Sequence, residues 1–276
     1  MNLAQALHTQ ARRYCQEQSE AHSQQAIAIK QTPAVDRPQA KQNLLNEYGC
    51  SEMLQWIQTE VERIDFDRLE NLDSTRDRIL TAAQAAEQKE PRANMGQTNR
   101  QYSLFQYNDQ TVIAMNHERQ QFCTAMRDLT ESQLKQVLAL PYQRVISIAE
   151  SQDRWSQIRQ KWDIKGYHWY PLHQRKLTNI TAFQQEEFED FCDSVSLVEL
   201  LQNKGIKRIW ELREDGLEYE QDATLLAPYY TGSEGYWTCS QLDWIIYASH
   251  GESITVGGWL LEDIKTLWPN WQQHLW

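Results

Sequence analysis

Residues 206–220, IKRIWELREDGLEYE, predict a β-hairpin toward the C-terminal end of the chain. Residues 206–212 have the composition of a strand, Asp215-Gly216 is a dipeptide that favours a tight turn, and residues 217–220 supply the partner strand. Helical patterns lie on both sides of this hairpin. Strands and helices mixed in this way indicate an α+β fold.

The sequence after the hairpin continues this mixture of elements. Residues 228–237 (PYYTGSEGYW) predict a loop, and Ser240 predicts the start of a helix because it is a good N-cap. A short strand is expected at 253–256. The dipeptide Gly257-Gly258 then turns the chain into a last helix.

The sequence before the hairpin has the same character. Residues 142–149 (YQRVISIA) have the strongest strand pattern in the chain, and apolar residues recur at helical spacing over 183–201. Asn108-Asp109 predicts the tight turn of another hairpin. These elements together predict one α+β domain that covers residues 100–276.

Residues 1–95 predict an N-terminal helical region, which ends in the polar, turn-rich segment 91–99 (PRANMGQTN). One predicted helix carries a narrow apolar stripe that could either form an internal core or join copies of the chain. The sequence therefore leaves open a homo-oligomer assembled through the N-terminal helices. The stripe consists of Leu54, Ile57, Val61 and Ile64.

Tryptophan is concentrated in the predicted α+β domain. Ten of the eleven tryptophans follow residue 150, and seven of them lie between Trp210 and Trp276. Tryptophan has the largest apolar surface of any side chain, and it carries an N–H that requires a partner when it is buried. This concentration predicts a Trp-rich core or an aromatic contact surface.

The charge of the chain is acidic, and the acidity increases toward the C-terminus. The net charge is −11, and residues 204–276 carry eleven Asp and Glu against five Lys and Arg. Binding to a phosphate backbone requires clustered Lys and Arg, so a nucleic-acid partner is not expected. The acidic charge suits a basic protein partner, and the alternative interpretation is that it only keeps the protein soluble, as in most acidic proteins.

The cysteines and the N-terminal sequence indicate where the protein functions. Five cysteines are scattered along the chain with no CxxC pair, which is typical of reduced thiols. The N-terminus has no apolar run of signal-peptide length, and no segment approaches the roughly 18 apolar residues of a spanning helix. A cytoplasmic protein without a membrane partner is expected.

The sequence contains no complete motif for a cofactor or a metal. Gly257-Gly258 could precede a helix N-terminus, but the glycine patterns of nucleotide-binding loops are absent. His117-Glu118 lacks the second histidine of HExxH, and His168 is five residues from His173 in a segment that contains a proline. No metal and no other cofactor is therefore predicted.

One segment combines side chains that could carry out catalysis. His250 and Glu252 are the candidate pair, with Cys239 as a more remote candidate nucleophile upstream. A helix between Cys239 and His250 would hold them about 15 Å apart, so the two are not expected to touch. The alternative interpretation is a helix C-cap, in which His250 favours the helix dipole and Gly251 adopts the left-handed conformation.

Two groups of side chains suggest a contact surface. Acidic residues flank the predicted hairpin, and aromatic residues crowd the loop 228–237, where tyrosine and tryptophan offer a large contact area for little entropy. A fully packed core is the competing interpretation of the aromatic group. The candidate binding residues are Glu214, Glu218, Glu220, Tyr229, Tyr230, Tyr236 and Trp237.

The function expected from the sequence is a non-catalytic, cytoplasmic interaction protein, comparable to an immunity or adaptor protein, that uses the acidic and aromatic surface of its C-terminal domain. The alternative is a small-molecule hydrolase or transferase with a His/Glu site near residues 239–252. A structural subunit assembled through the N-terminal helices is a third hypothesis.

Overall fold

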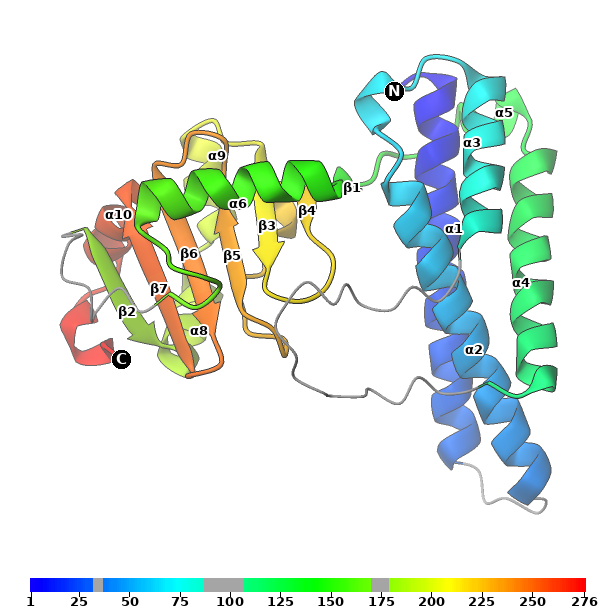
Figure 1. Cartoon of the computed structure of the whole chain (residues 1–276), viewed down its shortest axis with the longest axis horizontal. Coiled ribbons are helices and arrows are strands. Elements are labelled where there is room, and N and C mark those ends of the chain that lie inside the picture. The colour runs from blue at the N-terminus through cyan, green and yellow to red at the C-terminus, as the bar shows by residue number, and fades with distance from the viewer. Residues whose placement is uncertain (32–36, 87–106, 170–178) are drawn as a thin grey trace. The chain divides into compact units, whose positions relative to one another are not determined.

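The computed structural model describes residues 1–31, 37–86, 107–169 and 179–276, which form two compact units (Figure 1). The first unit covers Met1–Leu140 and the second covers Pro141–Trp276. The sequence predicts the division near residues 95–100, and the predicted boundary segment 91–99 lies outside the described residues. The difference arises because the helices α4 (Asp109–Asp128) and α5 (Glu131–Leu134) share a core with the helices that precede them.

The described part of the first unit is helical. Its core is formed by residues from all four of the longer helices, and it includes the stripe of Leu54, Ile57, Val61 and Ile64. These four side chains are buried within the unit, so they are not available to join copies of the chain. The elements are α1 (Leu3–Gln31), α2 (Arg37–Glu62), η1 (Phe66–Arg68), α3 (Leu72–Ala85), α4 (Asp109–Asp128) and α5 (Glu131–Leu134).

The hairpin expected around Asn108-Asp109 is wrong, because Asn108 is the N-cap of α4. Its side chain accepts a hydrogen bond from the backbone N–H of Thr111. Asparagine and aspartate favour helix starts as well as tight turns, so the dipeptide alone does not separate the two structures. Burial of Met115 and Phe122 on one side of α4 confirms the helical period.

The second unit is built on one seven-stranded antiparallel sheet with the strand order β1-β4-β3-β5-β6-β7-β2. The predicted hairpin is confirmed as β3 and β4, with Glu211 opposite Tyr219. The strands are β1 (Gln143–Val145), β2 (Ile180–Gln184), β3 (Arg208–Arg213), β4 (Tyr219–Asp222), β5 (Gly235–Thr238), β6 (Trp244–Ser249) and β7 (Ser253–Gly258).

Helices cover both faces of this sheet (Figure 1). One face packs against α6 (Ile148–Trp162). The other packs against α8 (Gln185–Ser194), α9 (Leu197–Asn203) and α10 (Trp259–Leu267). The 3₁₀ turns η2 (Ala223–Leu225) and η3 (Trp271–His274) complete the described elements.

The two cores explain the distribution of tryptophan. The core beneath α6 contains Trp155, Trp162, Trp169 and Trp210, and the opposite core contains Trp237, Trp244 and Trp268. Successive strand residues point to opposite faces, so Tyr236 enters the first core and Trp237 enters the second. The Trp-rich core and the α+β fold are therefore confirmed.

Several element predictions in this unit are wrong. The helix expected from Ser240 is strand β6, and the loop expected over 228–237 ends in strand β5. Strand β2 occupies part of the helical pattern expected over 183–201, and only Gln143–Val145 of the strand expected at 142–149 is extended. Both faces of β6 are buried, so its sequence lacks the alternation that identifies a half-exposed strand.

No helix in the described parts of the chain is both long enough and apolar enough to cross a bilayer.

Candidate functional site

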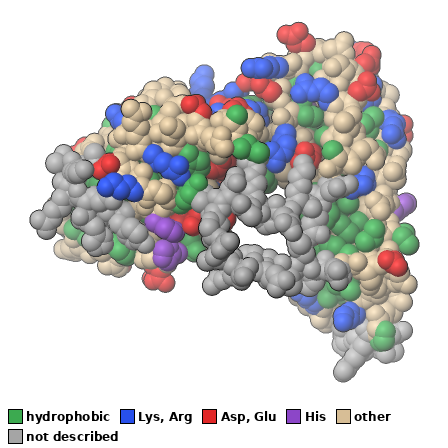
Figure 2. Space-filling model, viewed as in Figure 1, with side chains coloured by type: hydrophobic (Ala, Val, Ile, Leu, Met, Phe, Trp, Pro, Cys, Tyr) green, Lys and Arg blue, Asp and Glu red, His purple; other side chains and the backbone are tan. Residues whose placement is uncertain are grey.

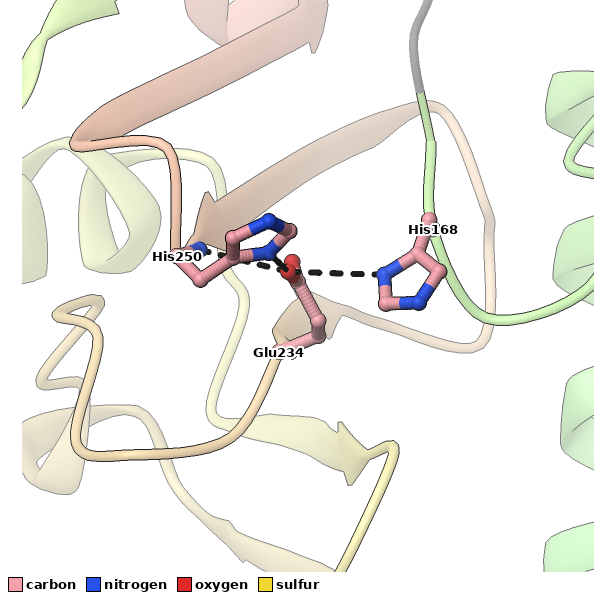
Figure 3. A group of neighbouring side chains, drawn as sticks. All are labelled: His168, Glu234 and His250. Carbon is pink, nitrogen blue, oxygen red and sulfur yellow. Dashed lines mark hydrogen bonds and ion pairs between the residues drawn. The ribbon is translucent and has the colours of Figure 1, made fainter. Parts of the chain in front are cut away.

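Three side chains from distant parts of the second unit converge at one end of the sheet (Figure 3). His168 follows α6, Glu234 immediately precedes β5, and His250 immediately follows β6. Each offers a nitrogen or a carboxylate oxygen, and these three atoms all lie within 4.8 Å of one another. Within the described residues, these three side chains lie closely enough together to share one metal ion.

The pairing of β5 with β6 brings Glu234 and His250 together. Gly235 lies opposite Ala248, so the residues just outside these two strands meet at the same end of the sheet. The backbone N–H of His250 donates to Oε1 of Glu234 at 3.2 Å, and Nδ1 of the same histidine contacts the same oxygen. Strand register therefore sets this half of the site.

The turn between β6 and β7 holds His250 in place. Ser249 and Ser253 pair at the base of the turn and join through their hydroxyl groups at 3.0 Å. The backbone N–H of Gly251 donates to Oγ of Ser249, and the indole N–H of Trp276 donates to the carbonyl of Gly251 at 2.9 Å. These bonds fix both sides of the turn.

His168 is held by aromatic neighbours on either side. The carbonyl of Tyr167 accepts a hydrogen bond from the hydroxyl of Tyr236 at 2.7 Å, and the ring of Tyr167 packs edge-on against Trp155. Trp169 is buried and packs edge-on against Tyr247. The residues before and after His168 are thus anchored to the core beneath α6.

The carboxylate at the centre of the site is buried, whereas the imidazoles are accessible. Glu234 is 1% exposed, and the side chains of His168 and His250 are 45% and 55% exposed. Nδ1 of His168 lies 3.4 Å from Oε1 of Glu234. Oε2 of Glu234 is also buried, and it has no hydrogen-bond partner in the described structure. A buried carboxylate oxygen without a partner is costly, so this site favours a bound cation.

A second carboxylate lies behind His168. Oε1 of Glu214 is 3.5 Å from Nε2 of His168, and the backbone N–H of Glu214 donates to the carbonyl of Glu234 at 3.0 Å. Burial raises the pKa of Glu214, His168 opposes that shift, and the negative charges of Asp215 and Glu234 add to it. Two carboxylates therefore flank His168, one near each nitrogen of its ring.

The donor set suits a divalent transition metal. Two ligands of a tetrahedral zinc ion with bonds of 2.0–2.1 Å are separated by about 3.3 Å. The separation between Nδ1 of His168 and Oε1 of Glu234 is close to this value. Nδ1 of His250 is closer to that oxygen and would have to move back on binding. Imidazole and carboxylate suit zinc, iron and nickel, whereas calcium and magnesium prefer sites made of oxygen.

Histidine side chains also reach the molecular surface next to acidic side chains on the face drawn in Figure 2. The accessibility of the two imidazoles provides a route by which an ion and a further ligand could reach Glu234. Two histidines and one carboxylate leave a coordination position open, which is the arrangement of catalytic rather than structural zinc sites.

The structure separates the three residues that the sequence analysis suggested for catalysis. His250 is in the site, and Glu252 is exposed in the same turn with a φ of 56°. Cys239 follows the opposite end of β5 and is 1% exposed, and its Sγ accepts the indole N–H of Trp244 at 3.1 Å. Burial raises the pKa of the Cys239 thiol. Cys239 is therefore a core residue and not an activated nucleophile.

The acidic residues proposed for docking have internal partners. Glu218 accepts the indole N–H of Trp155 at 2.5 Å, and Glu220 accepts a hydrogen bond from Nη2 of Arg144 at 2.8 Å. Arg154 lies 3.6 Å from the same carboxylate of Glu220. These two glutamates hold β4 to α6 and β1, so their first role is structural.

The aromatic residues proposed for docking divide into two pairs. Tyr236 and Trp237 are fully buried on opposite faces of β5. Tyr229 and Tyr230 are partly exposed, and Tyr230 packs against the core of α8, α9 and α10. Core packing therefore accounts for the first pair, and only the second pair keeps accessible surface.

Neither Glu234 nor His168 is identified as a site residue by the sequence alone. Glu234 stands in the apparently loop-like sequence GSEGYW, and His168 stands 66 positions before it. The pairing of β5 with β6 is the signal that could have linked Glu234 to His250. The sequence does not reveal this pairing, because its local patterns predict a loop over residues 228–237 and a helix from Ser240.

Comparisons with family models, with curated proteins and with solved structures find no match to this chain.

Proposed function

We propose that the second unit binds one divalent transition-metal ion of the zinc class through His168, Glu234 and His250, and that the protein uses it as a metal-dependent hydrolase of a small molecule. The observation that carries the proposal is Glu234, a buried carboxylate on which two imidazoles converge and whose second oxygen has no partner among the described residues.

The chemistry follows from the donor set. A zinc ion with three protein ligands lowers the pKa of a bound water to about 7 and so supplies a hydroxide nucleophile at neutral pH. His168 and His250 would each coordinate through Nδ1, because this is the nitrogen that faces Glu234 in both residues. The backbone N–H of His250 would continue to orient Oε1 of Glu234.

A zinc titration of the chelator-treated full-length protein, followed by calorimetry, tests the binding step. We expect saturation at one equivalent. Glu234→Ala and His250→Ala each remove one of three ligands, so each should weaken zinc binding by about tenfold or more. Loss of a residue that only positions a ligand already weakens metal binding 10- to 100-fold. His117→Ala is the matched control, since this histidine is exposed on α4 in the first unit. Equal affinity in all four proteins would overturn the proposal.

A panel of small chromogenic esters, amides and phosphoesters tests the hydrolytic step. We expect turnover that requires the metal and is lost in His250→Ala but retained in His117→Ala. Substitution with Co²⁺ gives a second readout, because a small chelating anion such as acetohydroxamate should change the visible spectrum if a coordination position is open. A spectrum that the anion leaves unchanged would indicate a closed, structural site.

The protein-binding function expected from the sequence now depends on fewer residues. Tyr236 and Trp237 are buried, and Glu214, Glu218 and Glu220 are partly exposed but each has a partner within the protein. Tyr229 and Tyr230 keep accessible surface. We therefore favour the metal-dependent function, which corresponds to the hydrolase alternative of the sequence analysis with a different set of residues around His250.

A further inference from the structure

The imidazole of His168 lies between two carboxylates, one at each ring nitrogen. Nδ1 is 3.4 Å from Oε1 of Glu234, and Nε2 is 3.5 Å from Oε1 of Glu214. His250 differs in this respect. It faces Glu234 through Nδ1, and the described residues give its Nε2 no hydrogen-bond or ion-pair partner. His168 therefore has a carboxylate near each of its ring nitrogens, whereas His250 has one only at Nδ1.

The sheet itself fixes the position of Glu214. The last residue pair between β3 and β5 is Arg213 opposite Gly235, and the next bond runs from the backbone N–H of Glu214 to the carbonyl of Glu234. The backbone N–H of Asp215 then donates to Oγ of Ser233 at 3.0 Å. The backbone around Glu214 is thus bound to the segment that carries Glu234, through the paired strands on one side and through the hydroxyl of Ser233 on the other.

We infer that Glu214 is a positioning residue for His168. Its carboxylate accepts the proton on Nε2, which leaves the lone pair on Nδ1 directed at the bound ion and holds the plane of the ring. A histidine ligand generally donates its other N–H to such a partner, and loss of the partner typically weakens metal binding 10- to 100-fold. This inference rests on the proposed function, because it concerns the same metal site.

Zinc affinity measured by competition with a chromophoric chelator tests the inference in the full-length protein. Glu214→Ala should bind zinc about 10- to 100-fold more weakly than the unmodified protein. Glu214→Gln keeps an oxygen that can accept the Nε2 proton, so its loss should be smaller. Asp215→Ala removes a neighbouring exposed carboxylate and should bind zinc as the unmodified protein does.

A double-mutant cycle separates positioning from a general effect of charge or folding. If Glu214 acts through His168, Glu214→Ala should cause no further loss of affinity in a His168→Ala background. The visible spectrum of the Co²⁺-loaded protein should change in Glu214→Ala and be restored in Glu214→Gln. The thermal midpoint of the metal-free protein should be the same in both variants.

The outcomes distinguish this inference from the proposal on which it rests. If the unmodified protein binds zinc and Glu234→Ala does not, but Glu214→Ala binds as tightly as the unmodified protein, the inference alone fails. It also fails if Glu214→Ala causes the same loss with and without His168. If Glu234→Ala leaves zinc binding unchanged, the metal site itself is wrong, and both statements fail together.

Discussion

Gly235 holds Glu234 at the start of β5, because only a residue without a side chain fits between the backbone and the indole of Trp237. A Cβ at this position would overlap the ring of Trp237, which lies above it in the core of α8, α9 and α10. The residue that follows the buried carboxylate is thus limited to glycine by packing. We expect a side chain at position 235 to displace Glu234.

Gly235→Ala should therefore weaken both folding and metal binding. Overpacking of a filled core costs about 1–3 kcal/mol, and the displacement of β5 would move Glu234 away from His250. Urea denaturation and zinc titration measure the two effects. In a Trp237→Leu background, where the indole is absent, the same substitution should cost much less. An equal cost in both backgrounds would contradict the role assigned to this contact.

The sequence identifies some of the site residues and not others, for a physical reason. His250 could be selected because imidazole is rare and reactive, and it does lie in the cluster. Glu234 could not be selected, because one glutamate among 38 acidic residues has no local feature that predicts burial. Its burial results from strand pairing with residues far along the chain. Long-range register is the information that local patterns lack.

At the scale of elements, the correct predictions concern elements with a local sequence pattern, and the wrong ones include strands that depend on long-range contacts. The β3–β4 hairpin and helix α10 were predictable because a tight turn and a helical apolar stripe are local patterns. Strand β6 was not, because helices cover both faces of the sheet there and every residue of the strand is buried. The α+β class could be predicted from the sequence, whereas the strand order could not.

The acidic residues around the hairpin give a test at this scale. Glu220 joins β4 to Arg144 on β1 and to Arg154 on α6, and all three side chains are mostly buried. Glu220→Lys would place a third positive charge beside two guanidinium groups. We expect it to lower the free energy of unfolding by about 2–4 kcal/mol, since loss of one partner leaves buried charge uncompensated.

Chemical denaturation monitored by tryptophan fluorescence checks this value, with Asp215→Lys as the control because Asp215 is exposed in the turn between β3 and β4. A surface role for Glu220 would give the two variants the same stability. That result would restore Glu220 as a candidate docking residue.

Three helices of the first unit meet at His22. Nδ1 of His22 on α1 lies 2.7 Å from Oε2 of Glu47 on α2, and its Nε2 lies 3.4 Å from Oε2 of Glu118 on α4. The pKa of His22 is raised, first by its hydrogen bond to Glu118 and then by Glu47, while burial opposes the shift. The folded state therefore binds the proton more tightly than the unfolded chain does.

The stability that His22 contributes should depend on pH in a defined direction. A raised folded-state pKa gives a contribution that is complete below the unfolded value of about 6.5 and is lost as the pH rises through the folded value. The loss should be up to about 1 kcal/mol, the range of partly exposed ion pairs. Unfolding free energies measured from mildly acidic to mildly basic pH should fall more steeply in the unmodified protein than in His22→Gln. A parallel pH dependence in the two proteins would contradict this assignment.

At the scale of the whole molecule, the chain forms two compact units that differ in structure. The described part of the first unit is helical, and its buried apolar side chains pack against one another in a single core. The second places tryptophan on both faces of one antiparallel sheet and holds an accessible imidazole pair at the end of that sheet. Composition predicted the location of the aromatic core. Only the folded sheet shows that a buried carboxylate lies beside the imidazoles.

Anomalous X-ray scattering at the zinc edge, from crystals of the zinc-loaded full-length protein, tests the metal site most directly. We predict one peak in the second unit, about 2.0–2.2 Å from Nδ1 of His168, a carboxylate oxygen of Glu234 and Nδ1 of His250. A zinc-loaded crystal with no peak at this position, and with Glu234 still hydrogen-bonded to His250, would contradict the account.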